Sequence, residues 1–198
     1  MSEEDVLKLA TRRKIYNYIL KHPGLHEREL SRRLDVPLAT LDYHLFYLNK
    51  KEFIILKSDE RFTRYFVTGK MGVEDKKVLT ILRQKVFRKI IIFLLLNPFS
   101  PHRDISEFIG LARSTTSFHL NRLIDLEIVL NTEEGREKKY YVKETNHVSD
   151  MLVTYQKSFF DSAVDRFVDS WLEMHPRYIR KTKKKEKELS LLSLFETL

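Results

Sequence analysis

Seven outward-facing polar, basic or aromatic side chains fall within ten consecutive residues and combine the groups that contact a nucleic acid. They are Arg113, Ser114, Thr115, Ser117, Phe118, Asn121 and Arg122. Arginine and asparagine pair with guanine and adenine edges, serine and threonine bind phosphates, and an aromatic ring packs on the thymine methyl group. A basic cluster that suits the flanking backbone or minor groove follows: Arg136, Lys138 and Lys139. The pattern predicts contact with double-stranded DNA.

An earlier stretch of the chain carries a second set with a different character. Its candidate DNA contacts are Thr40, Tyr43, His44, Tyr47, Arg61 and Arg64. Most outward positions here are apolar, and Asp42 would be unfavourable beside phosphates unless it accepts from cytosine or pairs with an arginine. We therefore expect the later set to read the base sequence more strictly. The earlier set would position the protein on DNA or partly serve a protein contact.

The composition argues against other kinds of chemistry. The 198 residues carry a formal charge of +8, no cysteine and only five glycines, which excludes disulfides and thiol chemistry and argues against Gly-rich phosphate loops. The seven histidines are scattered, and no metal site or catalytic constellation follows from their spacing. The longest apolar run, residues 90–96, is too short for a membrane span, which needs about 20 residues. We expect a cytoplasmic protein with no enzymatic activity, cofactor or metal.

An internal repeat determines the organisation. A shift of 75 residues aligns residues 12–67 (the first repeat) with 87–142 (the second repeat) without a gap, and 15 of the 56 pairs are identical. Unrelated segments would share roughly three or four. The two DNA-contact sets occupy corresponding positions, as Thr40 and Thr115 or Arg61 and Arg136 show. The repeat predicts two small domains of one fold.

Hydrophobic periodicity predicts three helices and a two-stranded hairpin in each repeat. In the first repeat we expect helices at about 6–21, 26–34 and 38–51 and strands at 53–56 and 63–67. In the second we expect helices at about 77–96, 102–109 and 113–125, strands at 127–131 and 138–142, and a loop at 132–137.

This order of elements resembles the winged helix-turn-helix. Residues 39–48, ATLDYHLFYL, and 114–123, STTSFHLNRL, are similar to the recognition helix T-V-S-Y-H-L-x-x-L of ArsR-like and MarR-like prokaryotic regulators. The resemblance covers most of residues 10–143, and the organisation is most similar to tandem winged-helix regulators of archaea. These families usually have Ala-Gly before the wing, so Phe53 and Ile128 depart from the pattern. The Cys or His/Asp metal sets of ArsR relatives are not matched.

The expected fold class is mostly α with small β-hairpin wings: two tandem winged helix-turn-helix domains plus a C-terminal amphipathic helix. The predicted boundaries are 1–70 and 75–143 for the two domains, 71–74 for a linker, 144–175 for the C-terminal helix and 176–198 for a tail.

The C-terminal third leaves two interpretations of each part open. The helix expected at about 147–174 has a wide aromatic face, which either packs on the second domain or forms a homodimer; we favour the dimer. The tail has a basic block and a Leu/Phe-rich end. It is either a solvated terminus, an arm on DNA phosphates, or a segment that docks on a membrane surface or on a protein of the transcription machinery.

The sequence as a whole predicts a sequence-specific transcriptional regulator of double-stranded DNA. Its recognition helices would enter the major groove, and its wings would contact the flanking backbone. The alternative is an adaptor that uses winged domains to bind proteins of the transcription machinery or a membrane-surface site.

Overall fold

The computed structural model describes residues 10–59, 62–135 and 137–175. Contacts between residues divide them into two units, which we call unit 1 (residues 10–80) and unit 2 (residues 81–175). The boundary lies inside helix α5, Val73–Leu82, which begins within the predicted linker. Each unit is described by itself.

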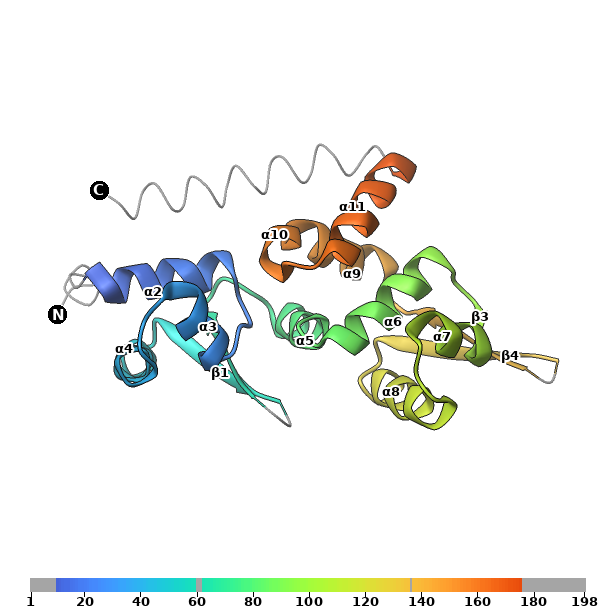
Figure 1. Ribbon diagram of the computed structural model, residues 1–198, viewed down its shortest axis with the longest axis horizontal. Helices are drawn as coiled ribbons and strands as arrows, with labels where there is room; N and C mark the ends of the chain where they lie inside the picture. Colours follow the sequence, from blue (N-terminus) through green and yellow to red (C-terminus); the bar gives the residue numbers. More distant parts are fainter. Residues whose placement is uncertain (1–9, 60–61, 136, 176–198) are drawn as a thin grey trace. The chain divides into compact units, whose positions relative to one another are not determined.

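Unit 1 has the three helices and the hairpin that the first repeat predicts. Helices α3 and α4 pack on each other, and α2 packs on α4 and on strand β2. The two strands pair antiparallel from Ile54 opposite Val67 to Ser58 opposite Thr63 and extend away from the helices (Figure 1). The elements are α2 (Ala10–Lys21), α3 (Glu27–Leu34), α4 (Leu38–Lys50), β1 (Ile54–Ser58) and β2 (Thr63–Val67).

Buried apolar side chains at helical spacing hold these elements together. Leu41, Leu45 and Leu48 of α4 are buried against Ile15 and Ile19 of α2 in one core cluster. Burial of each such side chain contributes about 1.5–3 kcal/mol. The face of α4 that points away from this core is therefore fixed in orientation.

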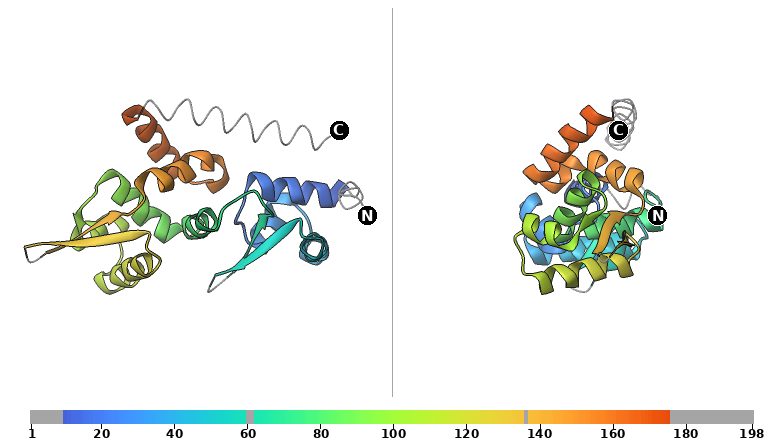
Figure 2. Two further views of the ribbon diagram at one scale, coloured as in Figure 1. Left: turned by 180° about the vertical axis from the view of Figure 1, so that it is seen from behind. Right: turned by 90° about the vertical axis from the view of Figure 1, so that its right-hand side faces the viewer.

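Unit 2 repeats the arrangement and adds a short third strand. Strand β5 lies between β3 and β4, and the β4–β5 hairpin projects beyond the helices of the unit (Figures 1 and 2). Helix α7 packs on α6 and α8, as α3 packs on α4 in unit 1. The elements are α6 (Lys85–Leu96), β3 (Ser100–Pro101), α7 (His102–Ile109), α8 (Arg113–Asp125), β4 (Val129–Glu134) and β5 (Glu137–Val142).

The backbone shows the repeat independently of side-chain identity. Left-handed residues recur 75 positions apart: Gly24 and Phe99, Asp35 and Gly110, and Glu52 and Glu127. Glu52 and Glu127 occupy the turn before each wing, with φ of 62° and 54°. The turn expected to depart from the Ala-Gly pattern is thus formed by a glutamate in the conformation that glycine adopts most easily.

Three predicted boundaries are wrong. The single helix expected at 77–96 is two helices, α5 and α6, because the chain breaks at Arg83 and Gln84. The loop expected at 132–137 is mostly strand, so the second wing is longer than predicted. The single helix expected at 147–174 is three: α9 (Thr145–Thr154), α10 (Gln156–Phe159) and α11 (Ser162–Met174).

Helices α9 to α11 pack on their own unit. Helix α11 contacts α6 and α9, and the Arg88 guanidinium binds the Asp161 carboxylate, with Nε 3.1 Å from Oδ2. Arg83 donates to the Ser158 carbonyl at 2.7 Å. The aromatic face that favoured a dimer is therefore largely covered within unit 2, since Phe159, Phe167 and Trp171 are buried there.

Two further points concern the C-terminal third of the chain. Phe160 and Met174, two apolar residues of the segment expected to form the aromatic face, are exposed. The tail at 176–198 lies outside the described residues. Among the residues that the structure describes, no helix has both the length and the apolarity to cross a bilayer.

Candidate nucleic-acid interface

Helix α8 presents most of the predicted contact residues on its outer face. Buried Thr116, Leu120 and Leu123 fix the inner face, and the Thr116 hydroxyl donates to the Ala112 carbonyl at 3.1 Å. Five predicted contacts are exposed as a consequence: Arg113, Ser114, Thr115, Phe118 and Asn121. Phe118 is 64% exposed.

The start of α8 leaves backbone donors available. Its N-cap residue is Ala112, which makes no side-chain capping hydrogen bond. The first N–H groups of a helix have no partner within the helix, and the helix dipole favours negative charge there. These N–H groups belong to the first residues of the helix, Arg113, Ser114 and Thr115.

Two predicted contacts of α8 are half-buried. Arg122 lies near the end of the helix, and Ser117 faces the preceding helix α7. The Ser117 hydroxyl lies 2.9 Å from Nε2 of His102, whose Nδ1 lies 3.3 Å from the Ser106 hydroxyl. Sequence reasoning missed His102, although its place at the start of the helix before the recognition helix was a usable signal.

The wing of unit 2 carries both signs of charge. Lys138 is exposed and Lys139 half-buried, while Arg136 lies outside the described residues. Glu133 lies directly opposite Lys138 in the hairpin, and Glu137 precedes it in β5. The lysines can contact a phosphate backbone only in competition with these neighbouring carboxylates.

Helix α4 of unit 1 has an exposed face of aromatic and small residues. Thr40 is exposed, Tyr43 is 60% exposed, and Phe46 one turn later is also exposed. Tyr47 is half-buried because the Arg12 guanidinium stacks on its ring, 3.7 Å from the centroid. Compared with α8, this face offers fewer groups that read base edges.

His44 and Arg64 do not lie on the DNA-facing surface that was predicted for them. His44 is only 7% exposed, and burial, together with the nearby Arg12 charge, lowers its pKa below the usual value. Arg64 is 2% exposed; its Nε donates to Asp59 at 2.6 Å and its Nη1 to the Gly24 carbonyl at 3.0 Å. Both side chains are buried in unit 1. Arg61 lies outside the described residues.

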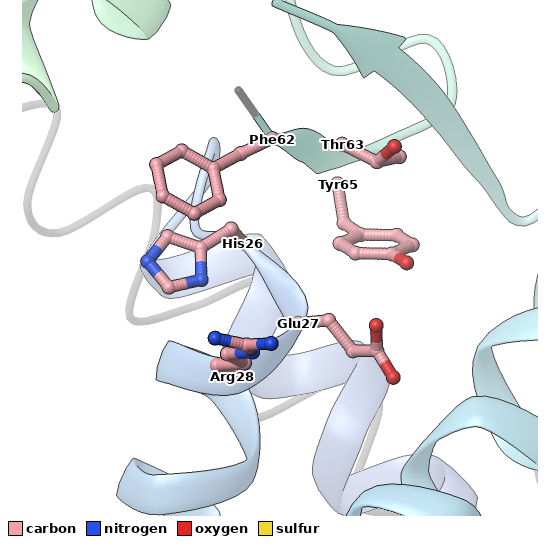
Figure 3. Close-up of a pocket in the computed structure, with 6 residues that line it drawn as sticks. All are labelled: His26, Glu27, Arg28, Phe62, Thr63 and Tyr65. Atoms are coloured by element: carbon pink, nitrogen blue, oxygen red, sulfur yellow. The ribbon is translucent and has the colours of Figure 1, made fainter.

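A cavity of about 360 Å³ lies between the start of α3 and strand β2. Figure 3 shows the His26 ring against the ring of Phe62, and the two rings stack at 4.4 Å. On the other side the Glu27 carboxylate lies below the Tyr65 hydroxyl (Figure 3). The cavity is lined by His26, Glu27, Arg28, Phe62, Thr63 and Tyr65.

Charges of both signs act on Glu27 at this cavity. Burial and the neighbouring Asp42 carboxyl group raise the pKa of Glu27 above its usual value, and the Arg28 guanidinium opposes this rise. Burial, Glu27 and Asp42 raise the pKa of Tyr65 to about 12. The described residues contain no group of three His, Asp or Glu side chains arranged to hold a metal ion.

The comparisons with known proteins agree with this architecture. The winged helix-turn-helix DNA-binding family matches the chain twice, at residues 8–55 and 88–129. An uncharacterised HTH-type transcriptional regulator of Methanocaldococcus jannaschii is 37% identical over 145 residues, which is 73% of this chain and 36% of that protein. The chain thus spans about a third of the length of this curated relative.

Two solved structures are similar at lower levels. The transcriptional regulator SlyA is 18% identical, with a TM-score of 0.36 over 58% of this chain and 84% of that one. Lactococcus lactis ZitR in complex with DNA is 14% identical, with a TM-score of 0.30 over 78% of this chain and 94% of that one.

Proposed function

We propose that this chain, which contains two winged helix-turn-helix DNA-binding domains, is a sequence-specific transcriptional regulator that binds double-stranded DNA. Helix α8 enters the major groove, and the β4–β5 wing follows the flanking backbone. The observation that carries the proposal is the outer face of α8, where five of the predicted contacts are exposed on a helix whose inner face is locked into a core. Two further predicted contacts of the same helix, Ser117 and Arg122, are half-buried.

Selection of bound fragments from genomic DNA identifies the target, and titration of a selected duplex at several salt concentrations tests the proposal. We expect log K to fall linearly with log salt, with a slope near −0.9 for each phosphate contacted. Affinity for the selected duplex should exceed that for a scrambled duplex about 10³-fold or more. Absence of duplex binding even at low salt would reject the proposal.

A variant pair separates a specific contact from general charge. Arg113→Ala removes an exposed guanidinium at the start of α8, whereas Lys157→Ala removes an equally exposed cation in α10, on the opposite side of unit 2 (Figure 1). A bidentate arginine contact to guanine is worth about 1–3 kcal/mol of discrimination. Arg113→Ala should therefore lower affinity for the selected duplex about 5- to 100-fold, and Lys157→Ala should change it little.

A second candidate function rests on the face of α4. Leu38, Tyr43 and Phe46 are exposed there, and an aromatic surface of this kind suits a protein partner of the transcription machinery. A correctly folded chain without duplex affinity at low salt would favour this adaptor over the DNA-binding regulator.

The remaining expectations of a cytoplasmic location and a homodimer belong to the same proposal. Phe160 and Met174 are the part of the C-terminal aromatic face that unit 2 leaves exposed, so they are the residues through which a dimer would form. Light scattering should give twice the chain mass of 23.8 kDa for the dimer, and a single chain mass would reject it.

A further inference from the structure

One pair of positions has opposite chemistry in the two units. The first residue of the helix before the recognition helix is Glu27 in unit 1 and His102 in unit 2, 75 positions later. The fifth residue of the recognition helix is Asp42 in unit 1 and Ser117 in unit 2, again 75 positions later. A pair of carboxyl groups in one unit thus corresponds to an imidazole and a hydroxyl in the other.

The two members of each pair are neighbours in both units. In unit 2 the His102 Nε2 and Ser117 Oγ lie 2.9 Å apart. In unit 1 the Asp42 carboxyl group lies close enough to Glu27 to raise the pKa of Glu27. The correspondence of the repeats therefore holds for the side chains as well as for the backbone.

An equivalent tyrosine lies beside each pair. Tyr65 and Tyr140 are equivalent, and both lie on the second strand of the wing. The Tyr140 ring lies 6.5 Å from the His102 ring, and the Tyr65 hydroxyl faces Glu27 (Figure 3). The two pairs therefore occupy equivalent places beside an equivalent tyrosine and differ in charge.

The position of the pair matters for DNA. When a recognition helix lies in the major groove, the helix before it crosses the phosphate backbone. Groups that join these two helices therefore face phosphates. An imidazole and a hydroxyl can donate hydrogen bonds to a phosphate oxygen, whereas carboxylates only accept when ionised. Like charges brought together at an interface are strongly unfavourable.

The remaining surface of unit 1 agrees with this difference. Arg64, the wing arginine expected on the backbone, is buried, and the outer face of α4 shows Tyr43 and Phe46 instead of arginine and asparagine. Sequence reasoning offered cytosine or an arginine as partners of Asp42; the structure places the Glu27 carboxyl group near Asp42, and the Arg28 guanidinium acts on Glu27.

We propose that each chain holds DNA through the recognition face of unit 2 only, and that the Glu27–Asp42 pair excludes the phosphate backbone from the recognition face of unit 1. This inference rests on the proposed DNA-binding function. It adds that the two repeats differ in DNA contact because of the two residues at the junction of their helices.

The repeat supplies the experiment, because each pair can be exchanged for the other in the full chain. Duplex affinity and its salt dependence are measured for Glu27→His/Asp42→Ser, for the near-isosteric Glu27→Gln/Asp42→Asn, and for His102→Glu/Ser117→Asp. The first two variants should bind a duplex about tenfold more tightly than the wild type, and the first should steepen the salt slope by about 0.9, as one added phosphate contact requires. The third should bind about tenfold or more weakly.

Charge-matched controls remove the effect of net charge. Asp35→Asn/Glu52→Gln changes two exposed acids of unit 1 by the same two charges, away from the Glu27–Asp42 pair. Asn146→Asp/Ser170→Asp adds two acids to exposed positions of α9 and α11. Circular dichroism establishes that each variant folds. The near-isosteric variant keeps the test valid if the histidine exchange unfolds unit 1.

The outcomes separate the two proposals. Duplex binding by the wild type with no gain over the control in either unit 1 variant overturns this inference and leaves the proposed function intact. Weaker binding by Glu27→Gln/Asp42→Asn also overturns this inference. The carboxyl groups would then contribute to DNA binding, for example by accepting a hydrogen bond from cytosine. A wild type that binds no duplex overturns both.

Discussion

Glu52 adopts the left-handed backbone conformation, with φ of 62°, at the turn before the first wing. This conformation costs a residue with a side chain about 1–2 kcal/mol. Glycine avoids that cost but loses more conformational entropy on folding, which destabilises the folded state by roughly 0.5–1 kcal/mol. Glu52→Gly should therefore raise the free energy of unfolding by about 0.5–1 kcal/mol in urea titrations followed by circular dichroism. Lys50→Gly, in the exposed last turn of α4, is the control and should lower it by about 1 kcal/mol.

Asp161 links the C-terminal helices to α6 through its ion pair with Arg88. Burial alone raises the pKa of Asp161, but hydrogen bonds from Arg88 and from the Ala163 N–H outweigh it and hold the pKa below 3.8. A lowered pKa means that the carboxylate stabilises the fold above its unfolded pKa. This contribution is lost as pH falls through the lowered value.

Asp161→Asn isolates that charge, because asparagine caps the start of α11 as well as aspartate does. At pH 7 the free energy of unfolding of the variant should be about 1.5–3 kcal/mol lower than that of the wild type, which is the contribution of a hydrogen bond to a charged group. The difference from the wild type should shrink as pH falls below 3.8. Urea unfolding followed by Trp171 fluorescence checks this, and a difference independent of pH would contradict it.

At the scale of elements, helix α8 and the β4–β5 wing should contribute in different ways. Asn121→Ala should reduce the preference for the selected duplex over a scrambled one by about 1–3 kcal/mol and leave the salt slope unchanged. Lys138→Ala should weaken binding to both duplexes alike and reduce the slope by about 1. Fluorescence anisotropy with both duplexes distinguishes them. The assignment of base reading to α8 fails if Asn121→Ala behaves as Lys138→Ala does.

The sequence predicted element type well and element boundaries less well. Recognition helices were predictable because their apolar residues follow one helical period. The breaks at Arg83 and at Phe160 were not, because no proline or glycine marks either one and the apolar pattern continues across both. Contacts between distant residues accompany them: Arg83 bonds Ser158, and Arg88 bonds Asp161 just after the left-handed Phe160.

The same reasoning explains which site residues were predicted correctly. Positions on α8 follow from helix periodicity alone. His44 lies at the border of the buried face, where helix periodicity does not decide between the two faces, and the packing of unit 1 leaves it only 7% exposed. Arg64 is buried because Asp59 and the Gly24 carbonyl come together around it, which no local pattern indicates.

At the scale of the whole molecule, each unit has its own core, and the single tryptophan reports on only one of them. Trp171 is 4% exposed in α11 of unit 2. Its fluorescence should follow the unfolding of unit 2, whereas circular dichroism follows the helices of both units. The two signals should therefore separate when one unit alone is destabilised.

Arg64→Ala provides that destabilisation. It leaves the Asp59 carboxylate and the Gly24 carbonyl without their buried donor, and loss of one partner of a buried ion pair costs about 3–5 kcal/mol. The circular dichroism transition should become biphasic, with its first step at lower urea, while the Trp171 transition stays at the wild-type midpoint. The equivalent Lys139→Ala in the partly exposed wing of unit 2 should change both signals little.

If unit 2 alone holds the duplex, the DNA affinity of Arg64→Ala should equal that of the wild type below the urea concentration of the first step. A Trp171 midpoint that shifts with the first step would show that the two cores unfold as one.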